Sequence, residues 1–240
     1  MKKAVLLVGH GSKDPEGNKE FEDFAARAGM RHCMLDYVEP SLPTALALLA
    51  AEGVSELAVI PYFLFAGGHV KKDIPFIIQN AQAQYPRMRI RLGRHLGLEP
   101  ALFEASTARL HDIEGRKVLL VGRGSLHPEP IRDMAAVSQA LRTCTRHPDI
   151  DHCFIALAPP DLPTGITHNH CADHRPPIVL PYFLFTGILV KRIIKISEQH
   201  GCEVRPHLGA HEALLTLVHQ RKTEILEGED HANDCRSASD

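Results

Sequence analysis

Two histidines and one glutamate in the first half of the chain could together bind a transition metal. His10, Glu39 and His69 each follow an apolar run, at spacings of 29 (39 minus 10) and 30 (69 minus 39) residues. Two imidazoles and one carboxylate are borderline ligands that suit Co, Ni, Fe or Zn, and the Irving–Williams order does not choose among these metals. Three protein ligands leave coordination positions open, whereas a closed four-ligand site would retain its metal. The three residues therefore predict a centre for metal transfer.

The apolar runs before these residues are typical of strands in a parallel sheet that is covered by helices on both faces. The expected strands are residues 3–8, 33–38, 57–64 and 88–92, and the expected helices are 17–29, 43–52 and 69–84. Pro75 should interrupt the last helix early. Because ligands of open α/β sheets bind beyond the carboxyl ends of the strands, we expect His10, Glu39 and His69 to meet at one edge of the sheet.

The chain contains an internal repeat. Residues 5–12, VLLVGHGS, recur as residues 118–125, VLLVGRGS, and PYFLFAG at 61–67 recurs as PYFLFTG at 181–187. Two weaker matches keep the same order, 39–43 with 159–163 and 94–97 with 206–209. Four matched blocks in one order indicate a duplicated domain.

The repeat predicts two tandem α/β sandwich domains, each with a small parallel sheet flanked by helices, and an active site in the cleft between them. We expect a catalytic domain at 1–114, a degenerate copy at 115–227 and a flexible tail at 228–240. In the copy, Arg123, Pro159 and Leu189 replace the three candidate ligands. None of these three can bind a metal, so only the first half should carry the chemistry. Residues 164–177 are a poor helical sequence, for which we expect a loop or a degenerate helix.

Cations gather at or just after the expected strand ends of both halves, where they could bind a polycarboxylate substrate. An alternative is that Lys71, Lys72, Lys191 and Arg192 only solvate the first turns of helices, although cations at a helix start oppose its dipole. Gly9-x-Gly11-Ser12 lacks the remaining residues of a dinucleotide or P-loop motif, and its glycines would instead let the backbone approach a ligand closely. The residues expected to bind the substrate are Ser12, Lys13, Gly67, Gly68, Lys71, Lys72, Arg123, Ser125, Lys191 and Arg192.

Three motifs taken together resemble those of the CbiX/SirB sirohydrochlorin chelatases. They are Val-Gly-His-Gly-Ser, Glu-Pro-Ser-Leu-Pro and Pro-Tyr-Phe-Leu-Phe-Ala-Gly-Gly-His-Val-Lys-Lys-Asp-Ile-Pro. The second copy of the last motif, at 181–192, resembles the long, two-domain CbiX form. The chain departs from the family pattern at residues 164–177 and in the short stretch between Gly17 and Cys33.

The resemblance implies ATP-independent insertion of Co²⁺ into sirohydrochlorin, in the anaerobic branch of cobalamin biosynthesis. It implies His10 and His69 as the catalytic pair, with Glu39 assisting, and no cofactor beyond the substrate metal. A ferrochelatase that uses Fe²⁺ to make sirohaem remains an alternative, as does a non-catalytic carrier of Co²⁺ or Ni²⁺. A phosphate-handling hydrolase is disfavoured, because the acidic and arginine residues of phosphoryl transfer are absent. We expect a monomer, because the two repeats supply both lobes.

Composition excludes several other classes of protein. With 27 Lys and Arg against 29 Asp and Glu, the chain has no general basic field for nucleic acid. Its apolar runs are too short for a membrane span, and the first is too short for a secretory signal, so we expect a cytoplasmic protein. Six cysteines without a C-x-x-C pair predict reduced thiols.

Two further groups of possible ligands have no assigned role. The segment His168-x-His170-Cys171-x-x-His174 could collect metal ions, or it could be a solvated loop. His231 and Cys235 lie in the expected tail.

Overall fold

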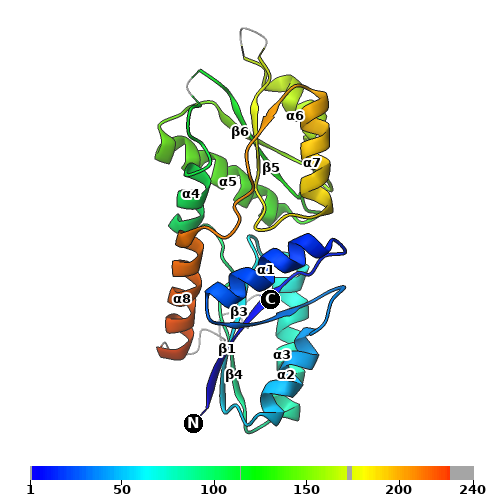
Figure 1. Cartoon of the computed structure of the whole chain (residues 1–240), viewed down its shortest axis with the longest axis vertical. Coiled ribbons are helices and arrows are strands. Elements are labelled where there is room, and N and C mark those ends of the chain that lie inside the picture. The colour runs from blue at the N-terminus through cyan, green and yellow to red at the C-terminus, as the bar shows by residue number, and fades with distance from the viewer. Residues whose placement is uncertain (1, 114, 172–174, 228–240) are drawn as a thin grey trace, which may run out of the picture. The chain divides into compact units, whose positions relative to one another are not determined.

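The computed structural model describes residues 2–113, 115–171 and 175–227, which form two α/β units (Figure 1). The first unit comprises residues 2–13, 21–97 and 215–227, and the second comprises 14–20 and the described part of 98–214. The predicted tail, with His231 and Cys235, lies outside the described residues. No helix in the described ranges is long and apolar enough to cross a membrane.

The first unit is built on a four-stranded parallel sheet with the order β2-β1-β3-β4. Its strands are β1 (Lys3–Gly9), β2 (Arg31–Met34), β3 (Glu56–Pro61) and β4 (Arg89–Leu92). The helical segments in or partly in this unit are α1 (Pro15–Arg27), α2 (Leu42–Ala51), the π-helical turn η1 (His69–Asp73), α3 (Ile74–Gln84) and α8 (Glu212–Glu227).

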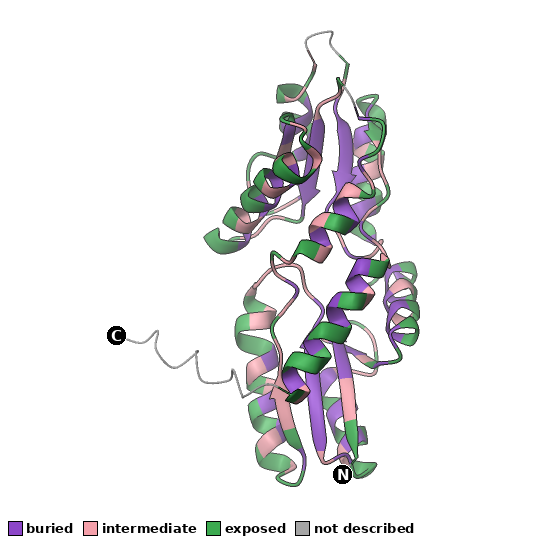
Figure 2. Cartoon of the chain, turned by 90° about the vertical axis from the view of Figure 1, so that its left-hand side faces the viewer, coloured by how far each residue is buried: buried purple, intermediate pink, exposed green. Residues whose placement is uncertain are grey.

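Alternate side chains of the sheet supply two cores. Leu6 and Val8 of β1 pack with Leu46 of α2 and Ile74 of α3 in one cluster of buried side chains. On helix α1, the ring of Phe24 lies 4.6 Å from that of the buried Tyr62, between ring centroids. Figure 2 shows the result, with buried strands between helices that are exposed on their outer sides. A sheet covered on both faces explains the nearly continuous apolar strands.

The second unit has a parallel sheet of the same topology, with the order β6-β5-β7-β8. Its strands are β5 (Val118–Gly122), β6 (Ile150–Phe154), β7 (Ile178–Pro181) and β8 (Glu203–Val204). Its helices include α4 (Pro100–Thr107), α5 (Pro128–Thr145), α6 (Leu162–His168) and α7 (Ile188–Gln199). The predicted pair of α/β sandwich folds is confirmed.

The compact units do not coincide with the two halves of the sequence. Helix α4 belongs to the second unit, whereas α8 from residue 215 onward belongs to the first. Within the first unit, the Nη1 of Arg91 donates a 2.8 Å hydrogen bond to the carbonyl of Ile225. The boundary between residues 114 and 115 therefore stays a prediction about the duplicated sequence. The packed units have other boundaries, including those after Gly97 and after Leu214.

Residues 164–177 are partly helical. Asp161 caps α6 by accepting a 3.0 Å hydrogen bond from the Thr164 N–H, and the helix ends at His168. Residues 169–171 and 175–177 are not helical, and 172–174 lie outside the described part of the chain. The expected degenerate helix is therefore found, but it is short and properly capped.

Candidate metal site

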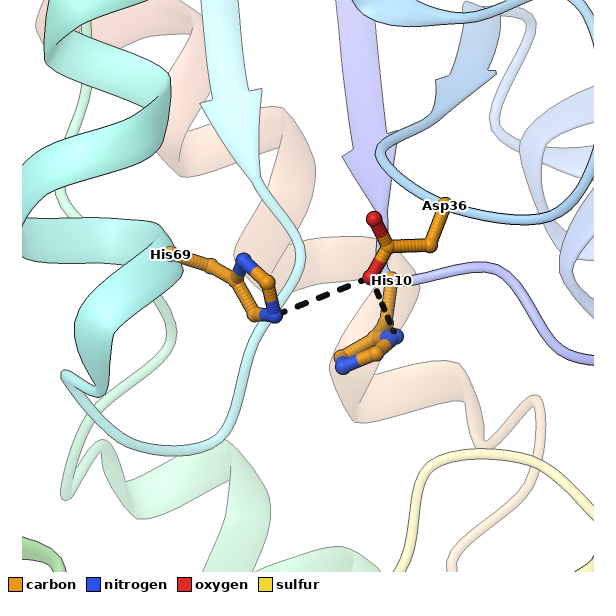
Figure 3. Close-up of side chains that lie close together, drawn as sticks. All are labelled: His10, Asp36 and His69. Atoms are coloured by element: carbon orange, nitrogen blue, oxygen red, sulfur yellow. Dashed lines mark ion pairs between the residues drawn. The ribbon is translucent and has the colours of Figure 1, made fainter.

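The side chains of His10, Asp36 and His69 lie together at the carboxyl end of the first sheet (Figure 3). Asp36 Oδ2 lies 3.9 Å from His10 Nδ1 and 3.8 Å from His69 Nε2. One ligand atom from each of the three residues lies within 4.8 Å of the other two. All three side chains are partly exposed, so the group is accessible to an incoming ion.

The geometry suits a single divalent ion. Two ligand atoms that each lie about 2.1 Å from one ion are roughly 3 to 4 Å apart, so small side-chain movements would bring these three into coordination. The two imidazole rings meet edge to face, with centroids 4.8 Å apart. Phe63 adjoins both rings, at centroid distances of 6.2 and 6.4 Å. One apolar side and one open side favour a site that holds an ion and can release it.

Gly11 brings His10 and Asp36 together. Beyond the end of β1, the Asp36 N–H donates a 3.0 Å hydrogen bond to the His10 carbonyl, which continues the pairing of β1 with β2. Gly11 has a φ of +84°, and a Cβ at this position would overlap the Asp36 carbonyl oxygen. The close approach that requires Gly11 is therefore to the backbone of Asp36, and the approach of this turn to a ligand stays a prediction.

His69 enters the site from the first residue of η1, after β3. Its Nδ1 lies 2.7 Å from Oδ2 of Asp73, whereas its Nε2 is the nitrogen nearer to Asp36. The two ring nitrogens therefore face two different carboxylates.

The carboxylate beside the histidines is that of Asp36, which the sequence analysis missed. Glu39 is exposed, and its Oε2 accepts a 2.7 Å hydrogen bond from the Ser41 N–H. This hydrogen bond holds the pKa of Glu39 below its usual value. Glu39 is not in the group of possible ligands found among the described residues. Its role at the metal stays a prediction.

The second sheet repeats the backbone of the site without its chemistry. The Ala156 N–H donates to the Arg123 carbonyl at 3.0 Å, as Asp36 does to His10, and Gly124 has a φ of +85°. Tyr37 and Leu157 share a left-handed backbone, with φ of 67° and 62°. At the offset of 120, Asp36 corresponds to Ala156. The carboxylate is thus present only in the half that has both histidines, and this difference between the halves could have identified Asp36.

The predicted substrate-binding residues of the first half all follow carboxyl ends of strands in the first unit. Ser12 and Lys13 come after β1, and the Lys13 Nζ lies 5.3 Å from the centroid of the Tyr37 ring. After β3 come Gly67 and Gly68 and then the exposed Lys71 and Lys72 of η1.

Those of the second half lie at the corresponding ends in the second unit. Arg123 and Arg192 are exposed, and the Oγ of Ser125 accepts a 3.0 Å hydrogen bond from the His127 N–H. The Nζ of Lys191 lies 2.7 Å from Asp14 Oδ2 and 2.9 Å from Glu16 Oε2. Lys191 therefore already has carboxylate partners within its own unit.

In the described part of the His168–His174 segment, the thiol of Cys171 makes two hydrogen bonds with backbone groups distant in sequence, those of Gly115 and Lys117. Cys171 Sγ accepts a hydrogen bond of 3.4 Å from the Lys117 N–H, while His174 lies outside the described residues. The five described cysteines are free thiols. Burial raises the pKa of Cys33 to about 12 and that of Cys202 to about 11, which makes these two unreactive.

Comparisons with known proteins give matches in both repeats of the chain. A family model described as CbiX matches residues 4–113 and 117–225, one match for each repeat. A sirohydrochlorin cobaltochelatase of Priestia megaterium is 30% identical over 248 residues, covering 95% of this chain and 81% of the relative. A sirohydrochlorin ferrochelatase of the same organism is also 30% identical, covering 92% of this chain and 90% of the relative.

A solved structure, SirB from Bacillus subtilis with Fe3+, superposes with a TM-score of 0.83 at 25% identity and covers 98% of both chains. SirB from Bacillus subtilis subspecies spizizenii in complex with cobalt gives a TM-score of 0.80 at 26% identity, covering 95% of this chain and 96% of that one. With a family match in each half and relatives of nearly full length, this chain belongs to the CbiX family of sirohydrochlorin chelatases.

Proposed function

We propose that this chain inserts Co²⁺ into sirohydrochlorin without ATP. The observation that carries the proposal is the group formed by His10, Asp36 and His69, two imidazoles and a carboxylate around one open position. Such ligands bind Co²⁺ and Fe²⁺ in the same way, and relatives named for cobalt and for iron are equally identical to this chain. The proposal of cobalt follows the relative that covers 95% of this chain, with iron as the competing substrate.

Metal insertion exchanges two protons of the tetrapyrrole for one divalent ion. The ion forms bonds to the four ring nitrogens, and two pyrrole N–H bonds break, releasing two protons. Imidazole accepts protons near neutral pH, so His10 and His69 first hold the ion and then take up protons as it leaves them. Asp36 lies between both rings and stabilises each imidazolium.

Glu39 adds negative charge three residues after Asp36 on the same loop. We assign it the assisting role that the motif implies, which is to favour entry of the divalent cation. The exposed carboxylate of Glu39 is ionised at neutral pH, as this role needs, and the hydrogen bond from the Ser41 N–H lowers its pKa further.

The peripheral carboxylates of the substrate would bind to cations at the strand ends. Lys13, Lys71 and Lys72 are exposed in the first unit, as are Arg123 and Arg192 in the second. Ser12, Ser125, Gly67 and Gly68 supply hydroxyl and backbone N–H donors on the same loops. Lys191 can contribute only by leaving Asp14 and Glu16. The working form is a cytoplasmic monomer in this proposal.

The decisive experiment follows the absorption spectrum of sirohydrochlorin anaerobically with Co²⁺ or Fe²⁺, with and without protein. The proposal expects a faster spectral change with Co²⁺ for the wild-type protein, and none above background for His10→Ala or His69→Ala. A preference for Fe²⁺ would reassign the enzyme as a ferrochelatase. Stoichiometric metal uptake without any spectral change would indicate a carrier and overturn the proposal.

A further inference from the structure

The two nitrogens of His69 have different carboxylate neighbours. Nδ1 lies 2.7 Å from Asp73 Oδ2, whereas Nε2 lies 3.8 Å from Asp36 Oδ2 and faces the metal site (Figure 3). We propose that Asp73 is a positioning residue, which fixes the ring of His69 and its tautomer so that Nε2 offers a lone pair to the metal. This inference rests on the proposed function, because it concerns the same site.

The chemistry of imidazole gives this contact its effect. A neutral imidazole has one N–H, and a carboxylate next to one nitrogen holds the proton there. With the proton on Nδ1, Nε2 has a free lone pair and can bind the metal, whereas a protonated Nε2 could not. Carboxylates that orient a metal-binding histidine in this way typically contribute about 10- to 100-fold in metal affinity.

The local backbone explains why Asp73 reaches His69. In η1, the Ile74 N–H donates to the His69 carbonyl, which is the i to i+5 pattern of a π-helical turn. Pro75 follows directly, and its ring cannot lie against the Lys71 carbonyl as a regular α-helix requires. The chain instead takes a wider turn, a feature that is frequent at functional sites.

The second repeat serves as a natural comparison. Helix α7 is a regular α-helix from Ile188. In its first two turns, Ile193 is the fully buried side chain, and in the first repeat the fully buried side chain at this place is Ile74. The offset between these two residues is 119 (193 minus 74), one less than the offset of 120 before the helix, so η1 contains one additional residue.

This additional residue accompanies a change of chemistry. The positions that can correspond to Asp73 in the second repeat are Arg192 and Ile193, and those that can correspond to Pro75 are Ile194 and Lys195. Neither pair preserves the carboxylate or the proline. His69, Asp73 and the wide turn therefore occur together in one repeat and are missing together from the other.

The test compares Asp73→Leu with Asp73→Asn in the full-length protein. Asn retains an oxygen that accepts a hydrogen bond from Nδ1, whereas Leu does not. We expect Asp73→Leu to weaken Co²⁺ binding at least about tenfold, as measured by calorimetry, and Asp73→Asn to recover most of this loss. Asp149→Leu changes another exposed aspartate, on the loop before β6, and should bind Co²⁺ like the wild-type protein.

A second readout reports on the tautomer itself. Long-range ¹H–¹⁵N spectra of ¹⁵N-histidine protein without metal, at mildly alkaline pH, distinguish Nδ1–H from Nε2–H, and His69→Gln assigns the signal of His69. We expect the Nδ1–H form in the wild-type and Asp73→Asn proteins and a mixture in Asp73→Leu. An unchanged tautomer and unchanged affinity in Asp73→Leu would overturn the inference. If the wild-type protein binds Co²⁺ but does not insert it, the proposed function fails, and these two measurements still decide the role of Asp73.

Discussion

Nε2 of His69 lies 3.8 Å from Oδ2 of Asp36, although β3 and β2, the strands that precede these residues, are not neighbours in the sheet. Strand β1 lies between them and ends at Gly9, so His10 follows the central strand. Strands β2 and β3 flank β1, so the loops after them place Asp36 and His69 on either side of His10. The site is a direct consequence of the strand order at the carboxyl edge of the sheet.

Asp36 is expected to be the carboxylate ligand. Replacing it with Asn retains its size but removes the charge that lies between two imidazoles, so Co²⁺ affinity should fall at least about tenfold, or about 1.4 kcal/mol. Glu39→Gln should mainly slow insertion, because Glu39 is hydrogen-bonded to Ser41 and is outside the group of ligands found among the described residues. Calorimetry gives the affinity and the sirohydrochlorin spectrum gives the rate.

Asp149→Asn, an exposed change of the same kind, serves as the control for both variants. The opposite pattern, with metal binding lost in Glu39→Gln and retained in Asp36→Asn, would make Glu39 the ligand.

Gly11→Ala should disrupt the site through the backbone. A Cβ at this position meets the Asp36 carbonyl, and a φ of +84° strains any other residue by about 1 to 3 kcal/mol. We expect a lower urea midpoint together with weaker Co²⁺ binding. Gly124→Ala introduces the same clash with Ala156 in the second unit, so it should destabilise the protein without weakening metal binding. Equal loss of metal binding in both variants would contradict a local effect of Gly11.

The sequence was sufficient to predict the architecture and the proximity of His10 and His69 at one edge of the first sheet. Apolar strands alternate with helices, and the repeat assigns the same order of elements to both halves, so the strands that precede His10 and His69 could be located from pattern alone. Their ends were less exact, because β3 ends at Pro61 and not at the predicted Leu64. Pro75 also marked the irregular start of its helix, as the π-helical turn η1 confirms. These features depend on residue types and on their order along the chain, both of which can be read from the sequence.

Which carboxylate lies beside the histidines depends on the conformation of the loop after β2, and a loop has no sequence periodicity from which its conformation could be predicted. Both carboxylates follow β2, and the left-handed Tyr37 between them turns the chain, so that one side chain faces the histidines while the other accepts a hydrogen bond from Ser41. The exchange of α4 and α8 between the packed units was equally hidden, because it reflects long-range packing and leaves no local signal.

The buried thiols should be chemically silent. Burial raises the pKa of Cys33 to about 12, against an ordinary value of 9.0, so its thiolate fraction is roughly a thousandfold smaller than that of an ordinary thiol. Among the five cysteines that the structure describes, Cys144 is exposed and should react first. Treating the native protein with a disulfide reagent at mildly alkaline pH and mapping labelled peptides by mass spectrometry tests this order. Early labelling of Cys33 would show that the sheet opens readily.

The ion pair between Lys191 and Asp14 should contribute to stability within a definite range of pH. Asp14 is buried, and the ammonium group of Lys191 holds its pKa below the ordinary value of 3.8. Its stabilising effect is therefore present above pH 3.8 and is lost as the pH falls through the lowered value. The carboxylates in turn raise the pKa of Lys191 above 10.5, so its effect is present below 10.5 and is lost as the pH rises through the raised value.

Lys191→Met should therefore lower the Tm at neutral pH, because it leaves the buried carboxylate of Asp14 without its cation. The difference from the wild-type Tm should shrink as the pH falls from 3.8 through the lowered pKa of Asp14, where its carboxylate becomes protonated in the folded protein as well. Combining Lys191→Met with Asp14→Asn should restore part of the lost Tm, since the buried charge is then removed as well. A Tm difference that stays constant from neutral to strongly acid pH, with no recovery in the double variant, would show that Lys191 is free for the tetrapyrrole carboxylates instead.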